Sequence, residues 1–122
     1  KTDAPVKQQA MAEIEELLVR NGASLITNGH DHNFEELAPH DANGKFDAQG
    51  IRSFVVGTGG RKLRKLKGQR WKDISRVFDA ETYGILRVEL FANRYSWAFL
   101  PSGDASRAKY AGTAPCRKRN IN

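Results

Sequence analysis

This sequence is poor in several features, and each scarcity excludes a class of protein. A single cysteine among 122 residues excludes an internal disulfide and any zinc site built from several thiolates. No apolar run approaches the roughly 20 residues that a membrane-spanning helix needs. The chain begins at Lys1 rather than at methionine and has no signal-peptide pattern. We therefore expect a processed chain or a piece of a longer one.

Basic residues outnumber acidic ones. Twenty Lys and Arg against 14 Asp and Glu give a net charge of +6, which favours anionic partners or a phosphate-bearing substrate without indicating a fold. Seven of the 20 lie in one short stretch: Arg61, Lys62, Arg64, Lys65, Lys67, Arg70 and Lys72. The length and the hydrophobic fraction of 39% fit one small domain.

Hydrophobic periodicity predicts a mixed α/β fold. Residues 4–21 carry one apolar stripe, formed by Val6, Ala10, Ile14, Leu17 and Leu18, which predicts a helix that packs on the core. Short apolar runs predict strands at 23–27 and 51–56, and alternation at 86–90 and 95–99 predicts a β-hairpin. We expect a polar loop with all three histidines after Gly29, a long surface loop at 61–80 and an irregular tail at 101–122.

The most informative stretch follows the first predicted strand: Gly-His-Asp-His-Asn-Phe-Glu at positions 29–35. Imidazole is the commonest neutral metal ligand. If a loop splays His30 and His32, the two rings can each serve one ion of a closely spaced metal pair. The alternative is a solvated pair of histidines without a metal. A position at the carboxyl end of a strand favours a ligand site.

The glycine-rich turn at 57–60 also ends a predicted strand. It lacks the Gly-Lys-Ser/Thr of a phosphate-binding loop, and Lys62 stands where a dinucleotide fingerprint needs glycine. We therefore interpret Gly57-Thr58-Gly59-Gly60 as a structural turn.

The segments at 29–35 and 50–60, together with 83–88 and the aromatic run around Trp97, resemble the C-terminal part of calcineurin-like metallophosphoesterases. The similarity is greatest to the purple-acid-phosphatase-like and alkaline-phosphatase-like branch of secreted enzymes. It implies a two-sheet sandwich flanked by helices, to which residues 1–122 contribute mainly one sheet and its edge helix, as a single domain or a fragment. It also implies a secreted or periplasmic location.

The resemblance implies a function, the hydrolysis of phosphate esters at a pair of Fe, Zn or Mn ions. It assigns His32 to the first metal and His30 to the second. Asp31, Asn33 and Gly29 are candidates for a supporting role beside the ligands or in the cleft. Asp31 can equally be a solvated loop carboxylate, and Asn33 can face the substrate or cap the loop, of which we favour the cap. Arg61, Lys62, Arg64 and Lys65 become candidates for steering an anionic substrate. Glu36 stands where the family usually has arginine, which predicts a reversed charge near the site. His40 matches no family role, and we expect it at the surface.

The resemblance also shows what residues 1–122 lack. The earlier family motifs Asp-x-His, Gly-Asp-x-x-Asp or -Tyr and Gly-Asn-His-Asp/Glu are absent, and a catalytic zinc normally has three protein ligands. We therefore predict that the isolated chain is inactive and that its partner is the missing N-terminal half, which could also hold a disulfide partner for Cys116.

A second hypothesis comes from another class of protein. The basic stretch at 61–72, interleaved with Leu63, Leu66 and Trp71, could form a module that binds a polyanion or nucleic acid. No helix-turn-helix, zinc-finger or RNA-binding motif accompanies it, so we favour the phosphoesterase.

Overall fold

The structure, a computed structural model, describes residues 3–65 and 73–118. One helix is followed by seven strands. Their bounds are α1 Asp3–Arg20, β1 Leu25–Asn28, β2 Phe34–His40, β3 Ile51–Val56, β4 Ser75–Asp79, β5 Gly84–Leu90, β6 Arg94–Pro101 and β7 Tyr110–Pro115. The helix, the first strand, β3 and the β5–β6 hairpin confirm the elements predicted from the sequence.

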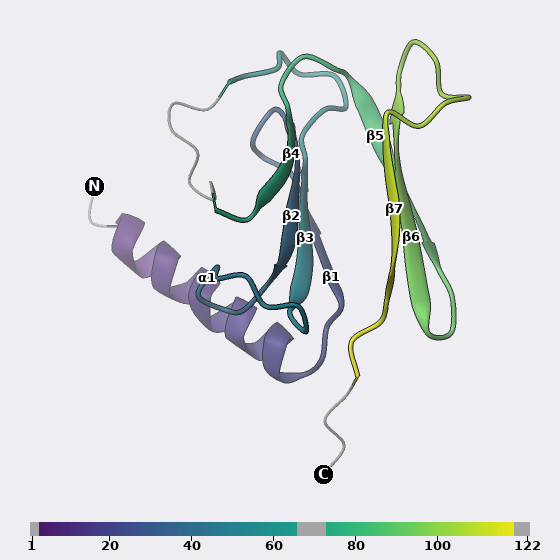
Figure 1. Ribbon diagram of the computed structural model, residues 1–122. Coiled ribbons are helices and arrows are strands. Elements are labelled where there is room, and N and C mark those ends of the chain that lie inside the picture. Colours follow the sequence, from purple (N-terminus) through teal and green to yellow (C-terminus); the bar gives the residue numbers. More distant parts are fainter. Residues whose placement is uncertain (1–2, 66–72, 119–122) are drawn as a thin grey trace.

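The strands form two sheets. The four-stranded sheet has the order β1-β3-β2-β4, and the three-stranded antiparallel sheet has the order β5-β6-β7. In the first sheet β1 runs parallel to β3, whereas β2 is antiparallel to both β3 and β4. Figure 1 shows the sheets face to face, with α1 on the far side of the four-stranded sheet. The mixed α/β class is confirmed, but this stretch of chain supplies two sheets rather than mainly one.

An aromatic core joins the sheets. The buried side chains of Phe34, Phe54, Tyr95, Trp97 and Phe99 form one cluster, and the rings of Phe34 and Phe99 lie 4.4 Å apart between centroids. Burying each of these side chains stabilises the fold by about 2–3 kcal/mol. Strand β7 passes close to this cluster because residue 112 is glycine, and a Cβ there would overlap the ring of Trp97.

Three strands lie where the sequence predicts loops. Strand β2 occupies most of the predicted histidine loop, and β4 ends the predicted surface loop at 61–80. Strand β7 lies inside the predicted irregular tail at 101–122. These segments lack the alternating apolar pattern of a strand, and pairing with neighbouring strands stabilises them instead. Strand β2 pairs on both sides, and β7 pairs along six residues of β6.

The helix does not bury its apolar stripe against the rest of the described chain. Ile14 and Leu17 of the stripe remain 48% and 53% exposed, and so does Met11 on the same helix, at 53%. The predicted core-packing role is therefore wrong for this side of α1, because no described element covers it. Among the residues that the structure describes, no helix is both long and apolar enough to cross a membrane.

Candidate metal centre

The two candidate ligands lie in the loop between β1 and β2. Because β1 and β3 are parallel, their carboxyl ends meet at one edge of the sheet, where ligands bind in open α/β sheets. His30 and His32 directly follow the end of β1, and the glycine turn at 57–60 directly follows the end of β3. The fold therefore brings the histidine loop and the glycine turn together.

Gly57 allows this close approach. A Cβ at position 57 would overlap the backbone carbonyl of Asp31, and the Gly57 N–H donates to the carbonyl of Asn33 at 2.9 Å. Gly29, in contrast, has room for a Cβ, whose nearest neighbour would be the carbonyl oxygen of Val56 at 3.6 Å. The tight constraint is therefore on Gly57, which the sequence analysis assigned only to a structural turn.

The ring of His32 is held in one orientation. Its Nδ1 lies 2.9 Å from the carbonyl oxygen of Lys62, and a carbonyl can only accept, so Nδ1 carries the proton. Within the described residues Nε2 has no hydrogen-bond partner, and its lone pair can bind a metal ion, as in metal-ligating histidines that donate from their other nitrogen. A second hydrogen bond, from the Arg64 N–H to the His32 carbonyl at 2.9 Å, fixes the backbone at the same residue.

His30 has an unusual backbone conformation. Its φ of 74° lies in the left-handed region, which few residues other than glycine adopt and which is frequent at functional sites. The residue is exposed. This conformation breaks the extended chain between β1 and His32, so the two side chains do not share the regular alternation of a strand.

The described chain offers too few ligands for a complete site. No group of three or more His, Cys, Asp or Glu side chains gathers anywhere within residues 3–65 and 73–118. Asp31 is exposed on the same loop. The donor set fits a part of a metal centre, since two imidazoles with one fixed tautomer suit transition metals, but it falls short of the three protein ligands of a catalytic zinc.

Two buried polar residues follow the histidines. Glu35 is 4% exposed, and its carboxylate accepts a hydrogen bond from the Ser75 hydroxyl at 2.7 Å. Burial raises the pKa of Glu35, and the nearby charge of Asp31 raises it further, against that hydrogen bond. Asn33 is 1% exposed, and its side-chain amide has no hydrogen bond within the described chain. The predicted capping role of the Asn33 side chain is therefore wrong.

Glu36 does not reverse the charge at the candidate metal site. Its carboxylate lies 3.5 Å from the Arg52 guanidinium and accepts a hydrogen bond from the Trp97 indole at 3.1 Å. Arg52 also stacks over the Trp97 ring. Because side chains alternate along β2, Glu36 points between the sheets with Phe34, whereas the buried Glu35 points to the other face.

His40 is not a surface histidine. It ends β2 at 5% exposure, where Nδ1 lies 2.9 Å from the Asp41 carbonyl oxygen and Nε2 lies 2.8 Å from the Ser53 hydroxyl oxygen. Both ring nitrogens are therefore occupied in structural hydrogen bonds. Thr58, in the glycine turn, is fully buried and donates to the Gly84 carbonyl at 2.8 Å, in keeping with a structural turn.

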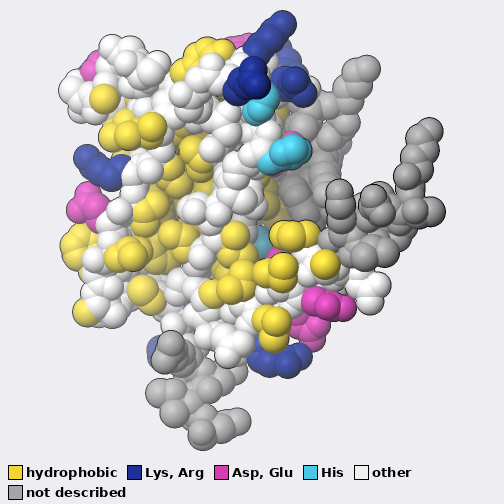
Figure 2. All heavy atoms as spheres, turned by 180° about the vertical axis from the view of Figure 1, so that it is seen from behind, with side chains coloured by type: hydrophobic (Ala, Val, Ile, Leu, Met, Phe, Trp, Pro, Cys, Tyr) yellow, Lys and Arg dark blue, Asp and Glu magenta, His cyan; other side chains and the backbone are white. Residues whose placement is uncertain are grey.

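The basic segment borders the histidine loop. Arg61, Lys62, Arg64 and Lys65 are exposed, and the two hydrogen bonds to His32 hold this segment against the loop. Figure 2 shows Lys and Arg side chains next to histidine side chains at the surface. The remaining basic residues of the predicted cluster, Lys67, Arg70 and Lys72, lie outside the described residues.

Comparison with known proteins identifies the fold. No protein-family model matches the sequence, and no curated protein matches it. The structure is similar to that of a purple acid phosphatase isolated from yellow lupin (Lupinus luteus) seeds, with a TM-score of 0.71 and 19% sequence identity. The similarity covers 82% of this chain and 19% of the lupin chain, so residues 1–122 span about a fifth of that phosphatase. The resemblance is therefore confirmed at the level of the fold: this chain folds as does part of a purple acid phosphatase, a calcineurin-like metallophosphoesterase.

Proposed function

We propose that this chain is the C-terminal part of a metal-dependent phosphoesterase, in which His30 and His32 each bind one ion of a dinuclear centre. A preceding part of the same enzyme supplies the other ligands, and residues 1–122 alone are inactive. The observation that carries the proposal is the hydrogen bond of His32 Nδ1 with the Lys62 carbonyl, which puts the unprotonated nitrogen of the ring at Nε2, near the carboxyl end of the sheet.

The metal pair, when bound, would polarise the phosphoryl oxygens of a phosphate ester and lower the pKa of water. The described residues would hold the metal ions, and the main chain would orient the imidazole rings that bind them. The main chain fixes the tautomer of His32, which presents Nε2. His30, the residue before Asp31, has the left-handed backbone conformation. Asp31 is the carboxylate nearest in sequence that can accept a hydrogen bond from an imidazole.

The preceding part of the enzyme, which is the proposed partner of this chain, covers one open side of the two-sheet sandwich. Strands β1 and β5 each end their sheet, so each has an edge without a neighbouring strand in the described chain. A groove of about 430 Å³ lies between them, with Val56, Leu86 and Val88 among its walls. Figure 2 shows hydrophobic side chains across the face that also carries histidines. Unpaired edges beside apolar surface favour the addition of further chain.

The resemblance also bears on the single cysteine and on the cellular location of the whole enzyme. Cys116 is a half-buried free thiol that packs against the aromatic core. A disulfide between Cys116 and a cysteine outside residues 1–122 stays a prediction, as does the secreted or periplasmic location that the resemblance implies.

The test is hydrolysis of an aryl phosphate by two proteins with and without added Fe, Zn or Mn. One is the 122-residue chain, and the other is the polypeptide encoded together with its upstream sequence. We expect metal-dependent hydrolysis from the longer polypeptide alone. The substitutions His30→Ala and His32→Ala should each lower kcat/KM by at least about 100-fold, since each removes a metal ligand.

His40→Asn is the matched control, because it removes a histidine whose nitrogens make structural hydrogen bonds. We expect it to lower stability and to leave the activity of the folded fraction nearly unchanged. Full activity of the longer polypeptide with both His30 and His32 replaced would show that the ligand assignment is wrong.

A further inference from the structure

We propose that the basic segment, residues 61–65, binds a second anionic group of the substrate. The preferred substrates are then small phosphate compounds that carry at least two anionic groups, rather than monoesters of uncharged alcohols. This inference rests on the proposed function, in which the histidine loop receives one phosphoryl group.

The first support is the position of the basic segment beside His32. The Lys62 carbonyl accepts from the His32 ring, and the Arg64 N–H donates to the His32 carbonyl. These hydrogen bonds clamp the backbone of residues 62–64 along His32. The side chains of Lys62 and its neighbours therefore start within a few ångströms of a proposed ligand, which is well within the reach of a Lys or Arg side chain.

The second support is the positive charge at residues 61–65, which is available to bind an anion. Four of the five residues at 61–65 are basic. Within residues 3–65 and 73–118, the side chains of Arg61, Lys62 and Arg64 make no ion pair. Lys65 lies 3.6 Å from the Glu81 carboxylate, a contact that is exposed to solvent and therefore weak. Of the nearby carboxylates, that of Glu35 is buried, whereas that of Asp31 is exposed on the histidine loop and makes no ion pair with the basic segment within the described residues.

The third support is the position of the described charges. Residues 61–65, the described part of the basic run, carry four basic side chains beside the histidine loop, and the run continues in the sequence to Lys72 and includes Trp71. Single-stranded nucleic acids are bound in extended grooves where bases stack on aromatic rings. The position of Arg61, Lys62 and Arg64 beside the proposed metal ligands instead favours two or three phosphate groups of one small molecule.

The test measures binding of inorganic pyrophosphate and of orthophosphate to the 122-residue chain by NMR titration. The buffer is free of metal, and its ionic strength is constant. Exposed charge pairs each contribute a few-fold in affinity at most, so three together predict a roughly tenfold preference for pyrophosphate. The triple variant Arg61→Gln, Lys62→Gln, Arg64→Gln should lose that preference and keep its circular dichroism spectrum.

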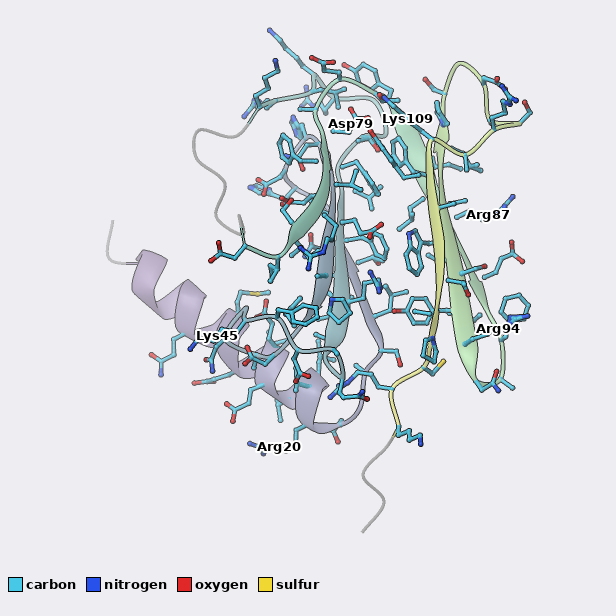
Figure 3. All side chains as sticks on the ribbon, in the orientation of Figure 1. Arg20, Lys45, Asp79, Arg87, Arg94 and Lys109 are labelled. Carbon is cyan, nitrogen blue, oxygen red and sulfur yellow. The ribbon has the colours of Figure 1, made fainter. Side chains whose placement is uncertain are left out.

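A matched control removes the same net charge elsewhere, with Arg20→Gln, Lys45→Gln and Arg87→Gln. Arg20 ends α1, Lys45 lies in the loop between β2 and β3, and Arg87 lies on β5 of the three-stranded sheet (Figure 3). In Figure 1, residues 61–65 lead into the grey trace at the end of the four-stranded sheet opposite to Arg20. This control should keep the pyrophosphate preference. Its loss would show that net charge alone attracts the anion, which would overturn the inference.

Two other results would also overturn it. One is equal affinity of the chain for orthophosphate and pyrophosphate. The other is affinity for single-stranded DNA that grows with strand length and far exceeds that for pyrophosphate, which would indicate a nucleic-acid surface. The pyrophosphate preference is measured without metal and without turnover, so it does not depend on the ligand roles of His30 and His32. Failure of the hydrolysis assay is thus distinguishable from failure of the basic segment.

Discussion

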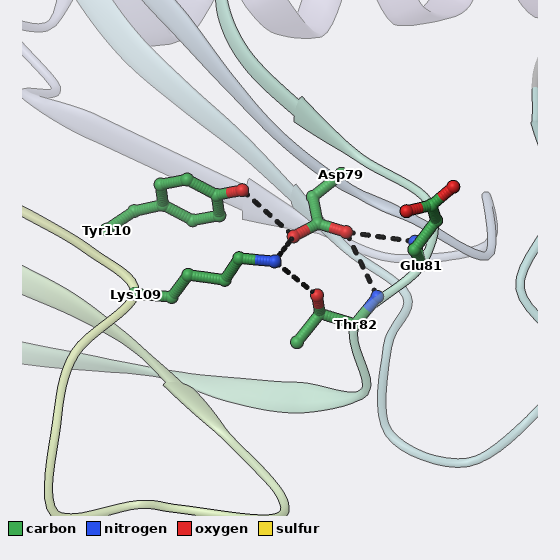
Figure 4. A network of polar contacts seen from close by, with 5 residues as sticks. All are labelled: Asp79, Glu81, Thr82, Lys109 and Tyr110. Carbon is green, nitrogen blue, oxygen red and sulfur yellow. Dashed lines mark hydrogen bonds and ion pairs between the residues drawn. The ribbon is translucent and has the colours of Figure 1, made fainter.

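The carboxylate of Asp79, at the end of β4, lies 2.9 Å from the ammonium group of Lys109, which directly precedes β7. Figure 4 shows the same carboxylate with three further partners. It accepts from the Tyr110 hydroxyl at 2.9 Å and from the backbone N–H groups of Glu81 and Thr82 at 2.9 and 3.0 Å. Because β4 and β7 belong to different sheets, this network ties the two sheets together at one edge.

Loss of the Asp79 charge should destabilise the sandwich. The Asp79 side chain is 4% exposed, so Asp79→Asn leaves the Lys109 ammonium and two N–H groups with a weaker acceptor. We expect the free energy of unfolding in urea to fall by about 2–4 kcal/mol. The control is Glu89→Gln, which breaks the exposed pair of Arg87 and Glu89 and should cost less than about 1 kcal/mol. Equal losses would contradict the role of this network.

The same network makes stability depend on pH. Burial raises the pKa of Asp79, but the N–H donors and Lys109 outweigh it and hold this pKa well below its usual value. The stabilisation is therefore complete above about pH 4, the pKa of Asp in an unfolded chain, and is lost as the pH falls through the lower folded value. Urea midpoints measured from pH 7 to pH 2 should converge for wild type and Asp79→Asn. A constant difference across that range would speak against the assignment.

Hydrogen bonding to Asp79 also raises the pKa of Lys109. The stabilisation from its charge is present below about pH 10.4, the usual pKa of Lys, and is lost as the pH rises through the higher folded value. The midpoint difference between wild type and Asp79→Asn should therefore be nearly constant from about pH 5 to pH 9.

Gly57 and Gly59 offer a matched pair of substitutions at the histidine loop. A Cβ at Gly57 would overlap the Asp31 carbonyl, whereas a Cβ at Gly59 would meet nothing within 4 Å. Gly57→Ala should lower the free energy of unfolding by about 1–3 kcal/mol and shift the imidazole NMR signals of His30 and His32. Gly59→Ala should leave both nearly unchanged. Similar effects of the two would mean that the loop does not depend on this contact.

Arg117 anchors the end of β7 to the helix. Its guanidinium donates to the carbonyls of Val19 and Ala23 at 3.0 Å each and of Gln49 at 2.8 Å. Carbonyls at the end of a helix lack partners and attract a cation. Arg117→Ala should cost about 1–3 kcal/mol of stability, and Arg117→Lys should not restore it because lysine lacks the planar fork. Lys118→Ala, at an exposed position, is the control for thermal unfolding.

The sequence predicted those elements whose pattern is local. The helix, β3 and the β5–β6 hairpin each carry their own periodicity. Strand β2 does not, because its polar side chains Glu35, Glu36 and His40 are buried or partly buried against distant partners. Those partners become neighbours only once the sheets have formed, so the local pattern resembles that of a loop.

The candidate site likewise has features that the sequence predicts and contacts that only the fold creates. The pair of histidines was evident from the motif at 29–35, and the resemblance that the motif supported is confirmed for the fold. The Lys62 carbonyl that orients His32 and the close approach at Gly57 depend on backbone geometry between segments about 25 to 30 residues apart. No side-chain type marks such contacts, so they could not be predicted from the sequence.

The central claim is that His30 and His32 each bind one metal ion, and metal content tests it most directly. The measurement is ions per folded molecule in the polypeptide encoded together with its upstream sequence, after removal of loosely bound metal. We predict two ions for the wild type and for His40→Asn, and one ion for each of His30→Ala and His32→Ala. Two ions retained in both alanine variants would contradict the account.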